Sequence, residues 1–145
     1  LGRKSDGVYT LVRDLKNAGV PIHGVGMQMH VTESSPPPIN DVRTNMARIA
    51  GLGLEVHITE MDVRVPIPAT EGDLVGQAQV YRNFLDLCVE TVNCTGLTLW
   101  GFTDRHSWVP GFFEGFGAAL IFDEDYQPKL AYHVMLGGVK EAAVC

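Results

Sequence analysis

Helix-like and strand-like segments alternate along the whole sequence, and this alternation limits the possible folds more than any other feature. Amphipathic helical spacing is predicted for residues 5–18, 41–50, 74–88 and 128–144. Apolar segments of strand character occupy residues 20–31, 54–63 and 96–102 between them. Strands that alternate with helices over short connections are typical of βαβ units. The pattern therefore predicts an α/β fold with a parallel sheet of three strands.

Residues at the ends of the helical segments predict where the helices begin. Ser5 is a candidate N-cap for the first helix, and either Asn40 or Asp41 is a candidate for the second. Thr70 and Asp73 have the spacing of a capping box at the start of the third helix.

The predicted sheet is too small to form a closed domain. Three parallel strands would leave two open edges, and each helix–strand unit takes roughly 30–45 residues. A TIM (β/α)8 barrel needs about 250 residues, whereas this chain has 145 and begins at Leu1 rather than Met. We therefore expect residues 1–145 to be one part of a larger α/β domain.

Charge and hydropathy exclude two classes of partner. The 11 Lys and Arg residues against 17 Asp and Glu residues give a net charge of −6, with no basic run. Nucleic acids and anionic membranes are bound by basic surfaces, and none is visible in the sequence. No apolar stretch approaches the roughly 20 residues of a membrane span. We expect neither kind of partner.

Polar and aromatic side chains gather at the carboxyl ends of the three predicted strands. Gln28 and His30 end the first strand, Glu60 and Asp62 the second, and Trp100 lies near the end of the third. In parallel α/β folds this edge of the sheet holds the ligand or the catalytic groups. The sequence therefore predicts that these five side chains converge on one pocket.

Strict alternation of side chains assigns the strand residues to faces. In the first strand, the apolar residues oppose the face of Gln28 and His30; they are Val25, Met27 and Met29. In the second strand, Val56 and Ile58 are expected to share a face with Glu60 and Asp62.

Other site chemistries find no support in the sequence. His57 and Glu60 are three residues apart on a predicted strand, so alternation places them on opposite faces and argues against a metal site. The chain has no Gly-x-Ser-x-Gly elbow. Its Gly24-Val25-Gly26 run lies within a strand that ends in a polar loop, unlike a dinucleotide-binding motif. We expect no metal and no cofactor.

Three longer runs resemble a known enzyme family. They are GVPIHGVGMQMHV (residues 19–31), GLEVHITEMDVRVP (residues 53–66) and LTLWGFTDRHSWVPGFF (residues 97–113). In order and spacing they resemble the last three strands of the family 10 glycoside hydrolases, the endo-β-1,4-xylanases, and the similarity covers nearly the whole chain. The resemblance implies a TIM (β/α)8 barrel, of which this chain would supply strands six, seven and eight with their flanking helices.

The resemblance also implies roles for the strand-end residues. Glu60 matches the nucleophile of a retaining glycosidase, and Asp62 matches the carboxylate that supports the neighbouring His30. Tryptophan rings offer flat apolar faces for sugar rings. The positions implied to bind substrate are Gln28, His30, Trp100 and Trp108. The implied substrate is xylan or a xylo-oligosaccharide.

A retaining glycosidase needs a second carboxyl group as acid/base. In the family this glutamate follows the fourth strand, and Glu33, Glu55 and Glu114 do not lie in a matching context. We therefore expect the 145 residues alone to be inactive on xylan and the parent protein to be active. Two alternatives remain open: a non-catalytic carbohydrate-binding remnant, and a related barrel glycosidase that acts on another β-glycan.

The resemblance implies a disulfide between Cys88 and Cys94, which the family often has at this place. The alternative is that Cys88 is a small buried apolar residue. With the disulfide formed, Cys145 would be unpaired. A disulfide implies an oxidising compartment, which fits a secreted polysaccharide hydrolase.

Overall fold

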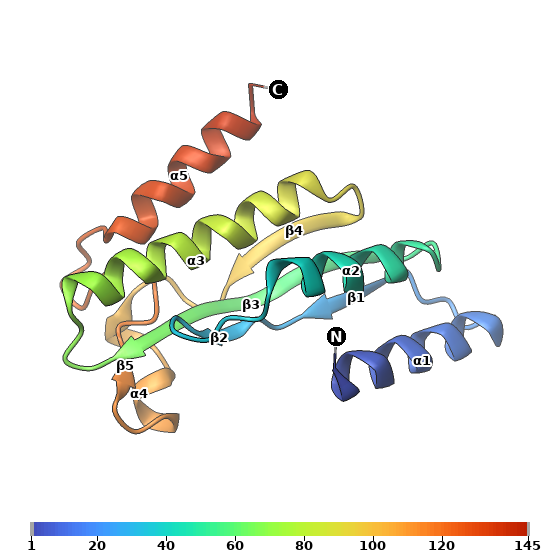
Figure 1. The fold of residues 1–145 in the computed structure, drawn as a ribbon, viewed down its shortest axis with the longest axis horizontal. Helices are drawn as coiled ribbons and strands as arrows, with labels where there is room; N and C mark the ends of the chain where they lie inside the picture. Colours follow the sequence, from blue (N-terminus) through green and yellow to red (C-terminus); the bar gives the residue numbers. More distant parts are fainter. Residues whose placement is uncertain (1, 145) are drawn as a thin grey trace.

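Strand β3 (Glu55–Pro66) is the centre of the sheet. It pairs in parallel with β1 (Gly24–Met27) and β2 (His30–Thr32) along one side, and with β4 (Cys94–Leu99) along the other. The short β5 (Phe116–Gly117) pairs antiparallel with the end of β3. This computed structural model describes residues 2–144, and the prediction for Cys145 lies outside them. The predicted parallel sheet is confirmed (Figure 1).

Helices and strands alternate in the predicted order, with α1 before the first strand. They are α1 (Arg3–Asn17), α2 (Ile39–Ala50), α3 (Glu71–Glu90), the short α4 (Val109–Phe112) and α5 (Leu130–Ala142), with a 3₁₀ turn η1 (Asp104–His106) before α4. In Figure 1, α3 runs along the sheet and α5 lies beyond it. None of the helices within residues 2–144 combines the length and apolar character needed to cross a membrane.

Two of the predicted helix starts are wrong, and one is confirmed. Gly2 rather than Ser5 precedes α1, and Pro38 rather than Asn40 or Asp41 precedes α2. Pro38 is not helical, with a ψ of 129°, but its carbonyl oxygen accepts from the N–H groups of Asp41 and Val42, so the helical hydrogen bonding of α2 begins before its polar residues suggest. The third prediction is correct, because the side chain of Thr70 accepts a hydrogen bond from the Asp73 N–H at 3.2 Å and caps α3.

Apolar side chains from α2 and α3 cover one face of the sheet and form the core. The most buried members are Met46, Ile49, Tyr81 and Phe84 from the helices and Val56, Ile58, Met61 and Val63 from β3, each at most 1% exposed. Val25, Met27 and Met29 pack against the same core, as alternation predicts. Burial of this apolar surface is the main stabilising contribution to the fold.

Strand β3 carries one extra residue, which corrects the predicted faces. From Ile58 to Met61 it advances three residues, while its partner β4 advances two, from Leu97 to Leu99. A β-bulge of this kind reverses the alternation of side chains beyond it. Helix-facing Ile58 is therefore followed on the same face by Met61. The prediction that Val56 and Ile58 share a face with Glu60 and Asp62 is wrong.

The other strand boundaries differ from the prediction for conformational reasons. Residues 20–31 form two short strands instead of one, because Met29 has a φ of +68° and interrupts the extended chain. Strand β4 ends at Leu99 instead of residue 102, and the nearby Gly101 has a φ of +107°. Trp100 therefore follows the strand.

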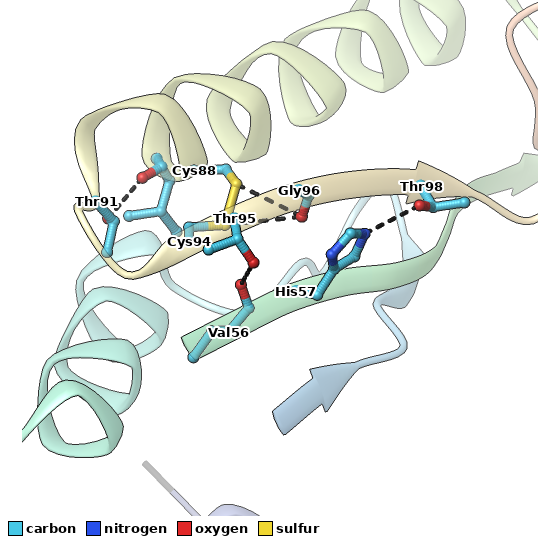
Figure 2. Close-up of a disulfide and its surroundings, with 9 residues drawn as sticks. Val56, His57, Cys88, Thr91, Cys94, Thr95, Gly96 and Thr98 are labelled. Carbon is cyan, nitrogen blue, oxygen red and sulfur yellow. Dashed lines mark hydrogen bonds between the residues drawn. A yellow bond between two sulfur atoms is a disulfide. The ribbon is translucent and has the colours of Figure 1, made fainter. Parts of the chain in front are cut away.

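A disulfide between Cys88 and Cys94 joins the end of α3 to the start of β4, so the predicted pairing is confirmed (Figure 2). Cys94 lies opposite Val56 in the sheet register, near the amino end of β3. Beside it, the Asn93 side chain donates hydrogen bonds to the carbonyl oxygens of Met46 and Leu54, each at 3.2 Å. The covalent link therefore stabilises the end of the sheet opposite Glu60.

The disulfide predicts the number of free thiols. With three cysteines in the sequence and two of them bonded, titration of the denatured, unreduced protein should find one free thiol per chain. The same titration after reduction is the control and should find all three. Three free thiols before reduction would contradict the disulfide.

Candidate active site

The imidazole of His30 lies between two carboxylates. Its Nε2 is 3.0 Å from Oε2 of Glu60, and its Nδ1 is 2.8 Å from Oδ2 of Asp62. His30 opens β2, whereas Glu60 lies at the bulge of β3 and Asp62 directly opposite His30. An imidazolium has two N–H donors, so one cationic ring could donate to both carboxylates at once.

Asp62 is the most buried member of this group. Its side chain is 0% exposed, and its Oδ2 also accepts a hydrogen bond from the indole Nε1 of Trp108 at 2.7 Å. Its Oδ1 has no hydrogen-bond partner among the described residues. A buried carboxylate needs donors to offset its lost hydration. Asp62 therefore ties β2, β3 and the loop that carries Trp108 to one point.

The carboxylates of Glu60 and Asp62 differ in their exposure to solvent. The Glu60 side chain is 25% exposed and the His30 side chain 18%, whereas Asp62 is sealed from solvent. Only Glu60 can approach a molecule from outside, while Asp62 can act only on the groups packed against it.

Two tryptophans lie beside His30. The ring centroid of Trp100 is 6.3 Å from that of His30, and the centroid of Trp108 is 5.0 Å away, both in edge-on orientations. Trp100 is half exposed, while Trp108 also packs against Phe112 and Phe113. The site thus combines an accessible carboxylate with flat apolar rings, an arrangement suited to a sugar ring.

The backbone of Gln28 is hydrogen-bonded to the backbone of Glu60. It falls between β1 and β2, and its carbonyl oxygen accepts a hydrogen bond from the Glu60 N–H at 3.1 Å. Its exposed side chain and His30 both line a groove of about 760 Å³ along β1, α1 and α2. Glu60 and the two tryptophans do not line that groove, so it is distinct from the surface above Glu60.

Because of the bulge, His57 and Glu60 do not lie on opposite faces of β3, as alternation had predicted when a metal site was considered. His57 and Glu60 lie on the same face of β3, opposite the core residues Ile58 and Met61. His57 is engaged elsewhere, with its Nε2 3.1 Å from the hydroxyl of Thr98. Within residues 2–144, no three His, Cys, Asp or Glu side chains are placed to hold a metal ion.

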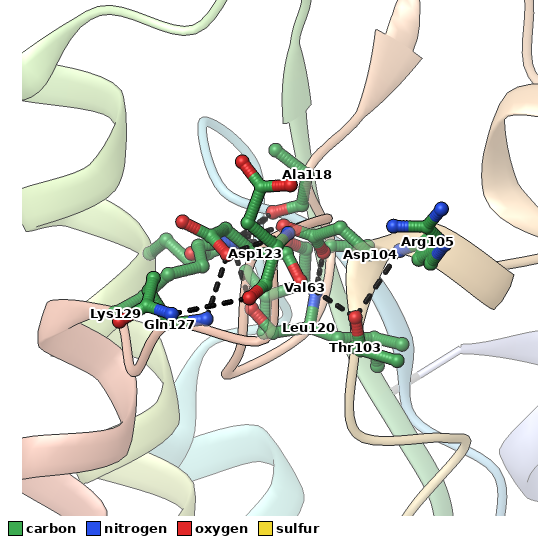
Figure 3. Close-up of polar contacts among 12 residues, drawn as sticks. Val63, Thr103, Asp104, Arg105, Ala118, Leu120, Asp123, Gln127 and Lys129 are labelled. Atoms are coloured by element: carbon green, nitrogen blue, oxygen red, sulfur yellow. Dashed lines mark hydrogen bonds and ion pairs between the residues drawn. The ribbon is translucent and has the colours of Figure 1, made fainter.

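A buried ion pair, for which the sequence analysis found no signal, holds the loop that carries Trp108. Lys129 Nζ lies 3.0 Å from Oδ2 of Asp104 and donates to the carbonyl oxygens of Ala118 and Leu120, each at 2.7 Å (Figure 3). Burial raises the pKa of Asp104 and lowers the pKa of Lys129, and the charge of each partner opposes the shift of the other.

Known proteins match the chain over nearly its whole length. The sequence model of Glycosyl hydrolase family 10 matches residues 2–137. Endo-1,4-beta-xylanase B of Thermotoga neapolitana is 44% identical over 135 residues, which cover 91% of this chain and 38% of the relative. Endo-1,4-beta-xylanase A of Humicola insolens is 42% identical over 139 residues, which cover 96% of this chain and 36% of the relative.

Solved structures match the fold equally well. Xylanase 10B from Thermotoga maritima superposes with a TM-score of 0.94 at 41% identity, covering 100% of this chain and 45% of that protein. Xylanase 10B from Thermotoga petrophila RKU-1, solved in complex with xylobiose, gives a TM-score of 0.93 at 41% identity, covering 97% and 43%. The chain therefore spans about two fifths of the length of these relatives.

The hydrogen bond from Trp108 to Asp62 predicts unequal costs for two matched substitutions. Trp108→Phe leaves a buried carboxylate with one donor fewer and should lower the free energy of unfolding by about 2 kcal/mol. Trp100→Phe changes a half-exposed ring and should cost no more than about 0.5 kcal/mol. Urea denaturation of both variants measures the difference. Equal costs would contradict the structural importance of the Trp108 bond.

Proposed function

The chain belongs to glycosyl hydrolase family 10, whose fold is the TIM barrel, and from this premise we propose that it supplies the carboxyl-terminal part of the catalytic domain of an endo-1,4-β-xylanase. The observation that carries the proposal is the contact of the accessible Glu60 carboxylate with His30, which Asp62 holds from its other side. Strands β1/β2, β3 and β4 then correspond to strands six, seven and eight of the barrel.

Glu60 is the proposed nucleophile of a retaining reaction. Its carboxylate would attack the anomeric carbon while the bond to the leaving oxygen breaks, and water would later hydrolyse the resulting glycosyl ester. A hydrogen bond from the His30 Nε2 would stabilise the ionised carboxylate and fix its direction. Asp62, by its burial and its contact with Nδ1, would keep the ring in place.

Asp62 does not fit the role of the second carboxyl group. It is sealed from solvent, and its Oδ2 already accepts hydrogen bonds from two side chains, so it cannot reach a leaving oxygen. We propose that the acid/base comes from the part of the barrel that this chain does not contain. That group would protonate the leaving oxygen and then activate the water.

The aromatic rings indicate where the substrate binds. Trp100 and Trp108 flank His30 and would pack against the apolar faces of xylose rings on either side of the reacting bond. Gln28, in the segment between β1 and β2, would reach a sugar hydroxyl from the groove that its side chain lines together with His30. The xylobiose complex of the Thermotoga petrophila relative supports xylo-oligosaccharides as ligands. The disulfide supports a secreted protein, because disulfides persist in oxidising compartments.

The proposal predicts that the 145 residues alone do not hydrolyse xylan. A completed barrel, in which the chain follows the amino-terminal part of the Thermotoga maritima xylanase 10B barrel, should be active, because it regains the acid/base. Release of reducing sugar from xylan measures both. Normal turnover by the chain alone would contradict the proposal that it lacks the acid/base. A folded completed barrel that binds xylan without turnover would favour a non-catalytic binding remnant. Faster turnover of a glucan would favour a different β-glycan.

A substitution pair on β3 tests the nucleophile in the completed barrel. Glu60→Gln keeps the shape of the side chain but cannot attack, so kcat on xylan should fall by more than about 1000-fold. Glu55→Gln changes an exposed glutamate at the other end of the same strand and should leave kcat unchanged. If the two variants retain the same activity, Glu60 is not the nucleophile.

A further inference from the structure

Gln77 is a buried polar residue on the core face of α3. Its side chain is 0% exposed among apolar neighbours that include Ala78, Tyr81 and Phe84. Its Nε2 donates to the carbonyl oxygens of Val63 and Ala118, at 2.7 and 2.5 Å. Because both partners are carbonyl oxygens, only the amide nitrogen can face them, which settles the orientation of the group.

Packing alone does not account for a glutamine at this position. Burying an amide costs free energy unless its hydrogen bonds are replaced, and the Oε1 of Gln77 has no hydrogen-bond partner among the described residues. A methionine would fill a similar volume in this apolar surrounding without that cost. The two donated hydrogen bonds are therefore the distinguishing property of Gln77.

Those hydrogen bonds fix the backbone immediately after Asp62. The carbonyl group of Val63 accepts from Gln77, and the Val63 N–H donates to the carbonyl oxygen of Ala119 at 3.1 Å. The peptide groups on both sides of Val63 are thus anchored to α3 or to the segment that begins at Ala118. A shift of this backbone would move the Asp62 carboxylate with it.

The segment from Ala118 to Leu120 is itself held rigidly. Ala118 has a φ of +43°, which is unfavourable for a residue with a side chain, and its carbonyl oxygen accepts from both Gln77 and Lys129. The Tyr81 hydroxyl donates to the carbonyl oxygen of Ala119 at 2.8 Å. Burial, reinforced by the nearby negative charges of Asp62 and Asp104, raises the pKa of Tyr81 well above its usual value, so this hydroxyl stays a donor.

We propose that Gln77 is a positioning residue for the candidate nucleophile. By holding Val63 against Ala118, it sets the place of the Asp62 carboxylate, which in turn aims the His30 ring at Glu60 and receives the Trp108 N–H. The proposal rests on the proposed function for its effect on catalysis, while its effect on the geometry of Trp108 can be measured independently of activity.

Gln77→Met in the completed barrel tests the proposal, with Gln79→Met as the control. Gln79 lies on the exposed side of the same helix, where its side chain donates a hydrogen bond to Asn83. Misplacing a reacting group by about 1 Å can cost about 100-fold in rate, so Gln77→Met should lower kcat by about 10- to 100-fold. KM should change by less than about 3-fold, because the sugar-binding rings remain. Gln79→Met should change neither value.

The indole N–H resonance of Trp108 in nitrogen-15 NMR spectra is the second readout. It is identified by its loss in Trp108→Phe, and it should shift in Gln77→Met and stay in place in Gln79→Met. Tyr81→Phe removes only the hydroxyl that donates to the Ala119 carbonyl oxygen, so it loosens the same segment and should shift the resonance in the same direction. This variant keeps the test decisive if Gln77→Met does not fold.

Two failures can be told apart. The positioning role is wrong, and the proposed function stands, if Gln77→Met keeps the parental kcat and Trp108 resonance while Glu60→Gln is inactive. Where Gln77→Met does not fold, the same result for Tyr81→Phe has the same meaning. If Glu60→Gln remains active, the proposed function fails, and a Trp108 resonance that still shifts would leave Gln77 with a purely geometric role.

Discussion

A single buried carboxylate, that of Asp62, organises the carboxyl end of the sheet. Its Oδ2 accepts hydrogen bonds from His30, a strand residue, and from Trp108, a loop residue 46 positions after Asp62 in the sequence. Removing such a charge from water costs several kcal/mol, and the donors that offset this cost must be held in place. The position of His30, the loop that carries Trp108 and the direction of Glu60 all follow from this requirement.

The amino and carboxyl ends of the sheet differ in the interactions that hold them and in the residues that they carry. The amino end is closed by the disulfide and by Asn93, which link α3, β4 and the core without contact to the candidate site. The carboxyl end holds the polar groups, and hydrogen bonds to the Asp62 carboxylate and to backbone carbonyl groups, instead of covalent links, keep it in place. This separation is common in parallel α/β folds, where stability and chemistry lie at opposite edges.

The sequence was sufficient for the parallel sheet and for placing Glu60, Asp62 and Trp100 beside His30, whereas the Gln28 side chain lines a separate groove. It failed at β3, because the bulge beside Glu60 leaves no trace in the alternation of side chains, and at Met29, whose left-handed backbone divides one predicted strand into two. Contacts between distant positions, such as Trp108 with Asp62, have no local signal at all. Gln77 did have one: it is spaced at 4 and 7 residues from Tyr81 and Phe84, which marks it as a polar residue on a buried helical face.

Covalent trapping of a sugar is the most direct test of whether Glu60 reacts and Asp62 only orients its neighbours. In a 2-fluoro xylobioside the fluorine slows both formation and hydrolysis of the glycosyl ester, and a good leaving group restores only its formation. The completed barrel should therefore accumulate a sugar bound to its nucleophile. Peptide mass spectrometry should then find the added mass of the 2-fluoro-xylobiosyl group on Glu60, the carboxylate that solvent reaches. A label on Asp62, or on any other residue of the chain, would contradict an account in which the buried carboxylate only orients and the exposed one reacts.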